Sequence, residues 1–147
     1  MQSTLTVELT LSPSNADLKI ISDGIGAFNA PYLPNDAEFD SGCRFALFAR
    51  NTQGQIVGGI QAHVVWSYCV LELLWLAEDT RGCGVGSALM AQLEVFAQQK
   101  GLIQIRTETL DFQAKPFYEK LGYRVYGELD DSPKGHTTYF LVKRLVD

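Results

Sequence analysis

A glycine-rich stretch between two apolar segments is the part of this sequence best suited to binding a charged ligand. It reads Arg81-Gly82-Cys83-Gly84-Val85-Gly86-Ser87. Glycines let the backbone adopt open dihedral angles and approach a ligand closely. The unpaired amides and the dipole of a following helix attract an anion, for which a diphosphate is the natural choice. Arg81 would add positive charge beside it, so the stretch predicts a diphosphate site.

Two other phosphate-binding motifs fit this stretch poorly. A P-loop needs a lysine after its glycines, and none follows here. A dinucleotide fingerprint needs a glycine where Ser87 stands, together with an early strand-helix-strand unit and an acidic residue about 20 positions further on. From this stretch alone, a purely structural turn without any ligand stays an equal alternative.

Two further side chains are candidates for proton transfer or substrate binding. Glu72 interrupts an apolar segment, where a carboxylate must be paired or face a cleft. Strand alternation would put Glu72 on the same side as Leu74 and Leu76. We expect Glu72 to act as a general base or substrate ligand, with a structural salt bridge or a buried hydrogen-bonded role as alternatives. Histidine is the side chain suited to proton transfer near neutral pH, so His136 is a second candidate base, whereas His63 lies in mid-strand and is interpreted as structural.

The hydrophobic pattern predicts the elements that position these residues. A first strand is expected over Thr6–Leu11, and a helix over 14–29, where apolar residues recur at helical spacing. The stretch Ala30–Gly42 has the composition of a loop over the active face. Three apolar strands are then expected. A turn at 51–54 joins the first of them to the second. They cover Arg44–Arg50, Ile56–Trp66 and Tyr68–Leu76.

The second half of the chain alternates between helices and strands. The strand that ends at Leu76 is almost continuously apolar, which is typical of a strand buried on both faces. A helix follows and ends at Lys100-Gly101. We then expect a strand, a short helix and two strands, over Leu102–Thr109, Ala114–Leu121, Tyr123–Glu128 and about 137–145. This order predicts an α+β (α/β) fold with one crossover region.

Composition and charge limit the class of protein. The chain has 147 residues, which fits a single domain over 1–147. A net charge of −5 argues against binding nucleic acid and mildly favours a cationic substrate. No apolar run reaches the roughly 20 residues that cross a bilayer, and no signal peptide is visible. The widely spaced Cys43, Cys69 and Cys83 form neither a disulfide framework nor a zinc site, which favours a cytoplasmic protein without a bound metal.

Two motifs, in order and at the expected distance, resemble those of the GNAT superfamily of N-acetyltransferases. Arg81-x-x-Gly84-x-Gly86 matches the family's Arg/Gln-x-x-Gly-x-Gly/Ala signature, and it follows the central strand as in that family. The segment from Ala114 to Tyr123 looks like the family's Ala-x-x-Phe-Tyr-x-x-x-Gly-Phe helix and turn. The tail over 133–143 is similar to that of small bacterial members. The resemblance implies the acyl-CoA N-acyltransferase fold, a mixed and mostly antiparallel central sheet flanked by helices.

The resemblance also implies a reaction, in which an amine attacks the thioester of acetyl-coenzyme A directly within a ternary complex. Tyr118 would protonate the departing thiolate, and main-chain groups of Leu74, Trp75 and Leu76 would bind the pantetheine arm. Many relatives carry an asparagine where this chain has Asp111, whose carboxylate would take over that coenzyme contact. The other coenzyme-binding residues that the resemblance implies are Arg81, Gly82, Cys83, Gly84, Val85, Gly86, Ser87, Ala114, Phe117 and Tyr118 again.

The acceptor is expected to be a primary amine of a small molecule, a peptide or a protein. Trp66, Tyr68, Phe28 and Tyr32 are candidates for the wall of its pocket. Two other functions stay open: a non-catalytic module that binds acyl-coenzyme A, and a toxin-like transferase acting on aminoacyl-tRNA. Tyr118 and the carboxylate on the central strand favour an enzyme, and the acidic pI counts against tRNA. Because dimers are common among relatives, a homodimer is a further expectation.

Overall fold

The structure is a computed structural model that describes residues 5–33 and 42–146, and the chain divides into two units, 1–33 and 34–147. The first unit contains the helix α1 (Asn15–Asn29), as predicted from its periodicity. Ser14 caps this helix, because its side-chain oxygen accepts from the amide of Asp17 at 3.1 Å. The prediction of one domain over 1–147 stays a prediction.

The strand predicted over Thr6–Leu11 is wrong. These residues have no regular structure, and their side chains are exposed. Alternation of apolar and polar residues favours a strand, but a strand needs a neighbour with which to exchange hydrogen bonds. The described part of the first unit contains only α1 as a regular element, so it offers the segment no such neighbour.

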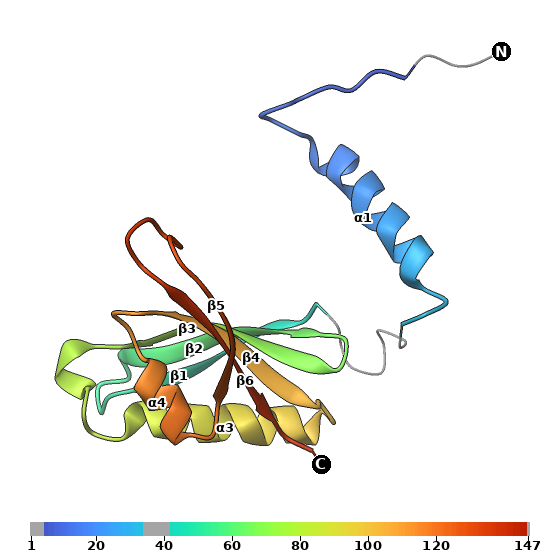
Figure 1. Cartoon of the computed structure of the whole chain (residues 1–147). Coiled ribbons are helices and arrows are strands. Elements are labelled where there is room, and N and C mark those ends of the chain that lie inside the picture. The colour runs from blue at the N-terminus through green and yellow to red at the C-terminus, as the bar shows by residue number, and fades with distance from the viewer. Residues whose placement is uncertain (1–4, 34–41, 147) are drawn as a thin grey trace. The chain divides into compact units, whose positions relative to one another are not determined.

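The second unit is built on a six-stranded sheet in the order β1-β2-β3-β4-β6-β5 (Figure 1). Its strands are β1 (Arg44–Arg50), β2 (Ile56–Val65), β3 (Tyr68–Leu76), β4 (Gln104–Leu110), β5 (Arg124–Leu129) and β6 (Thr138–Arg144). All neighbouring pairs are antiparallel except β3 and β4, which run parallel. The predicted mixed and mostly antiparallel sheet is therefore confirmed, and each of its strands lies within a few residues of its predicted range.

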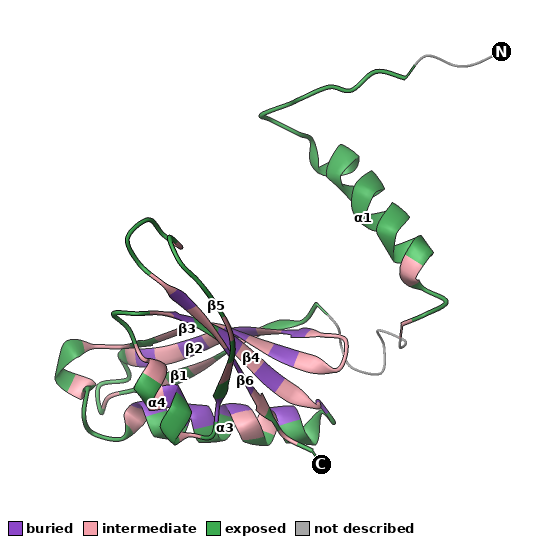
Figure 2. Ribbon diagram, viewed as in Figure 1, coloured by how far each residue is buried: buried purple, intermediate pink, exposed green. Residues whose placement is uncertain are grey.

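Two α-helices of this unit pack on the sheet, and a short turn of 3-10 helix, η1 (Glu78–Thr80), precedes them. The longer helix, α3 (Val85–Gln99), lies across β1 to β4, and α4 (Lys115–Lys120) follows β4 (Figure 1). The core forms between α3 and the sheet, and Figure 2 shows the buried residues on these elements. None of the described helices is long and apolar enough to cross a membrane.

A β-bulge in β3 changes which side chains face α3. Ala62 of β2 pairs with Leu71, but the next residue, Gln61, pairs with Leu73, so Glu72 is an extra residue in β3. Beyond the bulge Leu74 faces α3, while Glu72 points to the other face. The prediction that Glu72 shares a side with Leu74 and Leu76 is therefore wrong, because a bulge interrupts the alternation.

The bulge also changes the burial of β3. Cys69 and Leu71, before the bulge, are buried against α3. Leu73 and Trp75, after it, are exposed by 62% and 54%. The prediction that β3 is buried on both faces is therefore wrong for its second half within this unit. An apolar strand sequence predicts burial on average, but it does not say which elements cover each face.

Tyr123 is a buried tyrosine whose hydroxyl has no hydrogen-bond partner within residues 5–33 and 42–146. The residue is only 3% exposed, and this burial raises the pKa of its phenol. An unpaired buried hydroxyl costs about 1–3 kcal/mol. We expect Tyr123→Phe to raise the free energy of unfolding by about 1 kcal/mol, as measured by urea denaturation. Tyr126→Phe, at a half-exposed position, is the control and should change it little; a less stable Tyr123→Phe variant would contradict this account.

Candidate active site

A cavity of about 590 Å³ opens where β3 and β4 separate. The two strands pair only from Tyr68 with Gln104 to Leu71 with Thr107. Beyond this point the second half of β3 forms one wall, and the glycine turn (residues 81–87), the end of β4 and α4 complete the cavity, which we call the first cavity. Nine of the predicted site residues line it, namely Glu72, Leu74, Trp75, Leu76, Arg81, Gly86, Ala114, Phe117 and Tyr118.

The glycine turn has the geometry of an anion site. Gly82 and Gly84 have φ angles of 77° and 81°, in the left-handed region that favours glycine. Gly84 caps α3, and the first hydrogen bond of the helix runs from the amide of Ala88 to the Gly84 carbonyl at 3.0 Å. The amides over 85–87 therefore have no acceptor within the helix. They and the helix dipole are available to a negatively charged group.

Two contacts hold the glycine turn against the cavity wall. The Nε of Arg81 donates to the carbonyl of Leu76 at 3.2 Å, which ties the turn to the end of β3. Gly86 lies so close to α4 that a Cβ there would be 3.3 Å from the ring of Phe117 and 3.5 Å from a methyl group of Leu76. A glycine at this position lets the first turn of α3 approach both β3 and α4.

Tyr118 lies in the wall of the first cavity and is only 5% exposed. Burial raises the pKa of its phenol, and this effect outweighs a hydrogen bond with Thr107, which lowers it. The hydroxyl of Thr107 in turn donates to the carbonyl of Leu71 at 3.1 Å. Since Leu71 and Thr107 are the last paired residues of β3 and β4, these contacts hold the phenol at the point where the strands separate.

Glu72 accepts hydrogen bonds from Arg44 and Gln61 on the sheet face away from α3 and lies close to His63. Its oxygens lie 3.1 Å from Nη2 of Arg44, 3.4 Å from Nε2 of Gln61 and 3.5 Å from Nδ1 of His63. Desolvation raises the pKa of Glu72, but the hydrogen bond from Gln61, the charges of Arg44 and His63 and the Arg44 hydrogen bond together lower it below its usual value. The carboxylate is therefore ionised at neutral pH.

A second cavity of about 320 Å³ lies beside the first. Its wall comes from β3, β4 and β5. The residues that line it include Tyr68, Glu72, Arg106, Thr107, Glu108 and Tyr126. Three of these, Glu72, Thr107 and Glu108, also line the first cavity. The two cavities therefore meet at the place where β3 and β4 separate.

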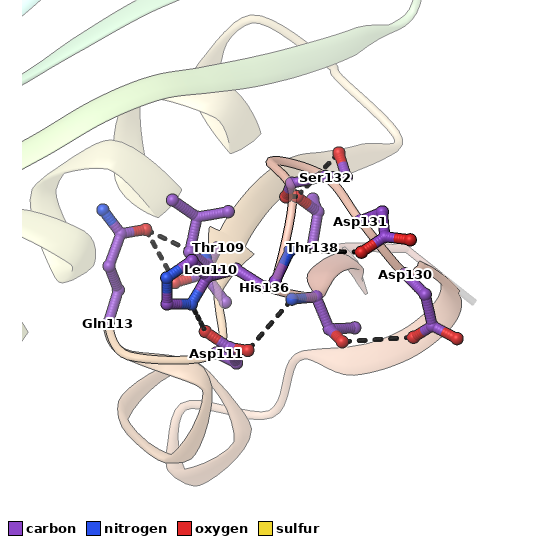
Figure 3. A network of polar contacts seen from close by, with 11 residues as sticks. Thr109, Leu110, Asp111, Gln113, Asp130, Asp131, Ser132, His136 and Thr138 are labelled. Carbon is purple, nitrogen blue, oxygen red and sulfur yellow. Dashed lines mark hydrogen bonds and ion pairs between the residues drawn. The ribbon is translucent and has the colours of Figure 1, made fainter.

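Asp111 and His136 lie outside the walls of both cavities. Figure 3 shows them in a polar network that joins the end of β4 to the β5–β6 connection. The Asp111 carboxylate accepts from the amide of Thr137 at 2.9 Å and lies 3.0 Å from Nδ1 of His136. These two contacts lower its pKa. Phe112 packs edge-on against His136, with ring centroids 4.9 Å apart, so this network holds the residues that follow β4.

The other predicted residues of the glycine turn do not line the first cavity, although their backbone forms the turn beside it. They are Gly82, Cys83, Gly84, Val85 and Ser87. Of the aromatic candidates for the acceptor pocket, Tyr68 lines the second cavity and Trp66 does not, while Phe28 and Tyr32 belong to the first unit. No group of three metal-ligating side chains occurs among the described residues.

Arg106, Glu108 and Tyr126 were not predicted from the sequence as site residues. A usable signal was present, since β4 reads Gln-Ile-Arg-Thr-Glu-Thr-Leu. In this strand polar side chains lie on both faces, which is unusual next to a buried parallel neighbour. Arg106 and Glu108 alternate with the buried Ile105 and Thr107, so both point to the face of the second cavity.

A mixed sheet that separates between its two parallel strands, with a glycine turn at the start of the helix that follows, is the architecture of the acyl-coenzyme A N-acyltransferases. Residues 18–123 match the acetyltransferase (GNAT) family. The chain is 40% identical over 102 residues to blasticidin-S acetyltransferase from Streptomyces morookaense. The aligned residues cover 69% of this chain and 75% of that protein. It is also 26% identical over 126 residues to an acetyltransferase from Agrobacterium fabrum, and these residues cover 86% of this chain and 89% of that protein.

The fold gives the same result. A crystal structure of an acetyltransferase from Bacillus cereus ATCC 14579 superposes with a TM-score of 0.83 at 30% identity, covering 94% of this chain and 98% of that one. The chain belongs to the acetyltransferase (GNAT) family. It is an acetyltransferase that uses acetyl-coenzyme A, as the resemblance implied, and the expectation of an enzyme is confirmed over that of a binding module.

Proposed function

We propose that this enzyme transfers the acetyl group to a primary amine by direct attack in a ternary complex. The observation that carries the proposal is the junction of the two cavities at Glu72, Thr107 and Glu108. Acetyl-coenzyme A in the first cavity and an amine in the second would meet there. Holding the two reactants together supplies the proximity that a bimolecular transfer needs.

The coenzyme is proposed to bind by main-chain groups at both ends of the first cavity. The free amides over 85–87, with the glycines that shape the turn, bind the diphosphate. The edge of β3 over 73–76, which pairs with no described strand on the β4 side, binds the amides of the pantetheine arm as an added strand would. Ala114 and Phe117 complete the wall beside that arm. Asp111 holds the loop before α4 rather than the coenzyme, which its contacts with Thr137 and His136 support.

Tyr118 is proposed as the general acid. The amine loses one proton before it attacks and a second from the tetrahedral intermediate, while the departing thiolate gains one from the phenol. The phenolate then recovers a proton from the intermediate or from solvent, so the tyrosine ends the cycle neutral. A backbone amide of β3 near the bulge would stabilise the oxyanion. The position of Tyr118 in the wall of the first cavity supports this role, and its phenol carries a proton throughout the neutral range, although burial makes it a weaker acid than a free tyrosine.

Glu72 is proposed as a ligand of the ammonium group rather than as its base. A carboxylate with a lowered pKa attracts a cation at neutral pH but accepts a proton poorly. The first proton of the amine then passes to water at the junction. His136, the other predicted base, is proposed to position the loop before α4, since it is bound to Asp111 and lies outside both cavities.

The acceptor is proposed to be a small molecule. The relative with 40% identity is a blasticidin-S acetyltransferase, so its acceptor is a small molecule rather than a protein or a tRNA. The second cavity, at about 320 Å³, is at the lower end of the size range of small-molecule pockets. The net charge of −5 agrees with a cationic amine group.

The test is a steady-state assay of coenzyme A release with acetyl-coenzyme A and a panel of small primary amines. We expect turnover with at least one amine, and we expect Glu72→Gln to raise the KM for that amine by about tenfold or more, as loss of a charge-assisted contact does. Glu128→Gln, on the exposed end of β5, changes the charge equally and is the control. No release with any amine, although the protein binds acetyl-coenzyme A, would contradict the proposal.

We propose a cytoplasmic location, which the free thiols of Cys43, Cys69 and Cys83 support. Burial raises the pKa of Cys69 to about 12, so this thiol stays protonated and inert. The homodimer stays a prediction from the resemblance.

A further inference from the structure

Charges of opposite sign lie at the two ends of the second cavity. Glu72 and Glu108 line it where it meets the first cavity, whereas Arg106 lines the second cavity alone. Arg106 and Glu108 are two residues apart on the same face of β4, so their backbones are about 6.6 Å apart along the strand. The cavity therefore changes from negative to positive over the length of a small molecule.

Arg106 is fixed in the cavity wall. Its guanidinium carbon lies 3.6 Å from the centre of the Tyr68 ring, a stacking contact. With the Gln104 amide turned so that its oxygen faces the guanidinium, that oxygen accepts from Nη2 and Nε at 2.8 and 3.0 Å. These bonds occupy two of the five N–H donors of a guanidinium.

The Arg106 guanidinium makes no ion pair with any residue that the structure describes. Glu72, by contrast, already has Arg44 as its partner. An arginine that is held in place by neutral groups and faces a cavity keeps its charge available for an anion. A carboxylate matches the planar arrangement of the N–H donors that remain on the Arg106 guanidinium.

The part of the cavity between the charged ends has an aromatic side chain. Tyr126 contributes a half-exposed ring from β5, whereas Tyr68 pairs with Gln104 beyond Arg106 and its ring is stacked under the guanidinium. Tyr126 is supported by Phe140, with ring centroids 6.3 Å apart. Aromatic faces favour a flat, partly apolar group over a flexible polar chain.

We propose that the acceptor is a zwitterion: a primary amine that also carries a carboxylate about 6–7 Å away, with a flat spacer between the two groups. The carboxylate binds Arg106, which Tyr68 holds in place, the spacer lies against Tyr126, and the amine reaches Glu72 and Glu108 at the junction. This inference rests on the proposed function and names the substrate class of its acceptor site. The spacing excludes α-amino acids, whose amine and carboxylate are attached to the same carbon.

The test compares two acceptors that differ only in charge, para-(aminomethyl)benzoate and para-(aminomethyl)benzamide. We expect the wild-type enzyme to prefer the benzoate by at least about tenfold in kcat/KM, the size of a charge-assisted bond. Arg106→Gln should reduce this ratio to near one, and Arg106→Lys should restore part of it. Arg124→Gln, an exposed arginine on β5 outside both cavities, should leave the ratio unchanged. A ratio near one in the wild type, or a ratio that Arg106→Gln does not alter, would overturn the inference.

A binding measurement separates this inference from the proposed function. The two compounds are titrated calorimetrically into the protein loaded with coenzyme A, where no chemistry occurs. If the benzoate binds more tightly than the benzamide, and Arg106→Gln removes the difference, the inference is supported even when neither compound is acetylated. In that case only the proposed chemistry fails. Equal binding of both compounds, or binding of neither, overturns the inference, whatever turnover other amines give.

Discussion

Replacing Tyr118 with phenylalanine is expected to lower kcat about 100-fold, the lower end of the usual effect of a general acid. The ring is buried against Tyr123 at 5.7 Å between centroids, and phenylalanine keeps that packing. Only the proton donor is removed from the point where β3 and β4 separate. Coenzyme A release under saturating acetyl-coenzyme A and amine measures the effect.

The same experiment has a matched control and a pH signature. Tyr123→Phe removes the neighbouring buried hydroxyl, which does not line the first cavity, and should leave kcat unchanged. Because burial raises the pKa of Tyr118 above its ordinary value of 10.0, the acid stays protonated as the pH rises to that value. Wild-type activity should therefore not decline through loss of this proton below about pH 10. Equal kcat values for Tyr118→Phe and the wild type would remove the tyrosine from the reaction.

Gly84→Val is expected to weaken binding of acetyl-coenzyme A at least tenfold. Gly84 caps α3 with a φ angle of 81°, and a β-branched residue in this region costs about 1–2 kcal/mol. Apart from its neighbours in the chain, no described atom lies within 4 Å of a Cβ built at this position, so the Cβ itself causes no clash in the free protein. The strain tilts the turn and moves the amides over 85–87, which are proposed to bind the diphosphate. Isothermal titration with acetyl-coenzyme A measures the loss.

Gly54→Val is the control for this experiment. Gly54 lies in the turn between β1 and β2, has a φ angle of 80° and likewise has no atom within 4 Å of a Cβ. Both variants should therefore lose similar stability, and only Gly84→Val should lose affinity. Equal affinity of the two variants for acetyl-coenzyme A would contradict a role of the glycine turn in coenzyme binding.

The sequence predicted the fold well wherever a local pattern is enough. The glycine signature after β3 and the Phe117-Tyr118 motif in α4 identified the family and the first cavity, because both depend on residue types at fixed spacing. The hairpin between β1 and β2 and the end of α3 at Gly101, with a φ angle of 74°, followed from glycine at left-handed positions.

Features that depend on pairing between distant segments could not be predicted in this way. The bulge at Glu72 is a mismatch of register between β2 and β3, and neither strand sequence contains it. The same mismatch gives Glu72 its partners Arg44 and His63, which are remote in sequence. The second cavity also escaped prediction, since Arg106 and Tyr126 meet there only through the strand order of the sheet.

The separation of β3 from β4 also affects the enzyme before it meets its substrates. Without coenzyme, β3 offers unpaired peptide groups over 73–76 beside the exposed apolar side chains of Leu73 and Trp75. Unpaired strand edges of this kind recruit other chains and promote aggregation. A coenzyme that occupies the edge would protect it and stabilise the native state by mass action. The supply of acetyl-coenzyme A would then control how much soluble enzyme accumulates, as well as how fast each molecule works.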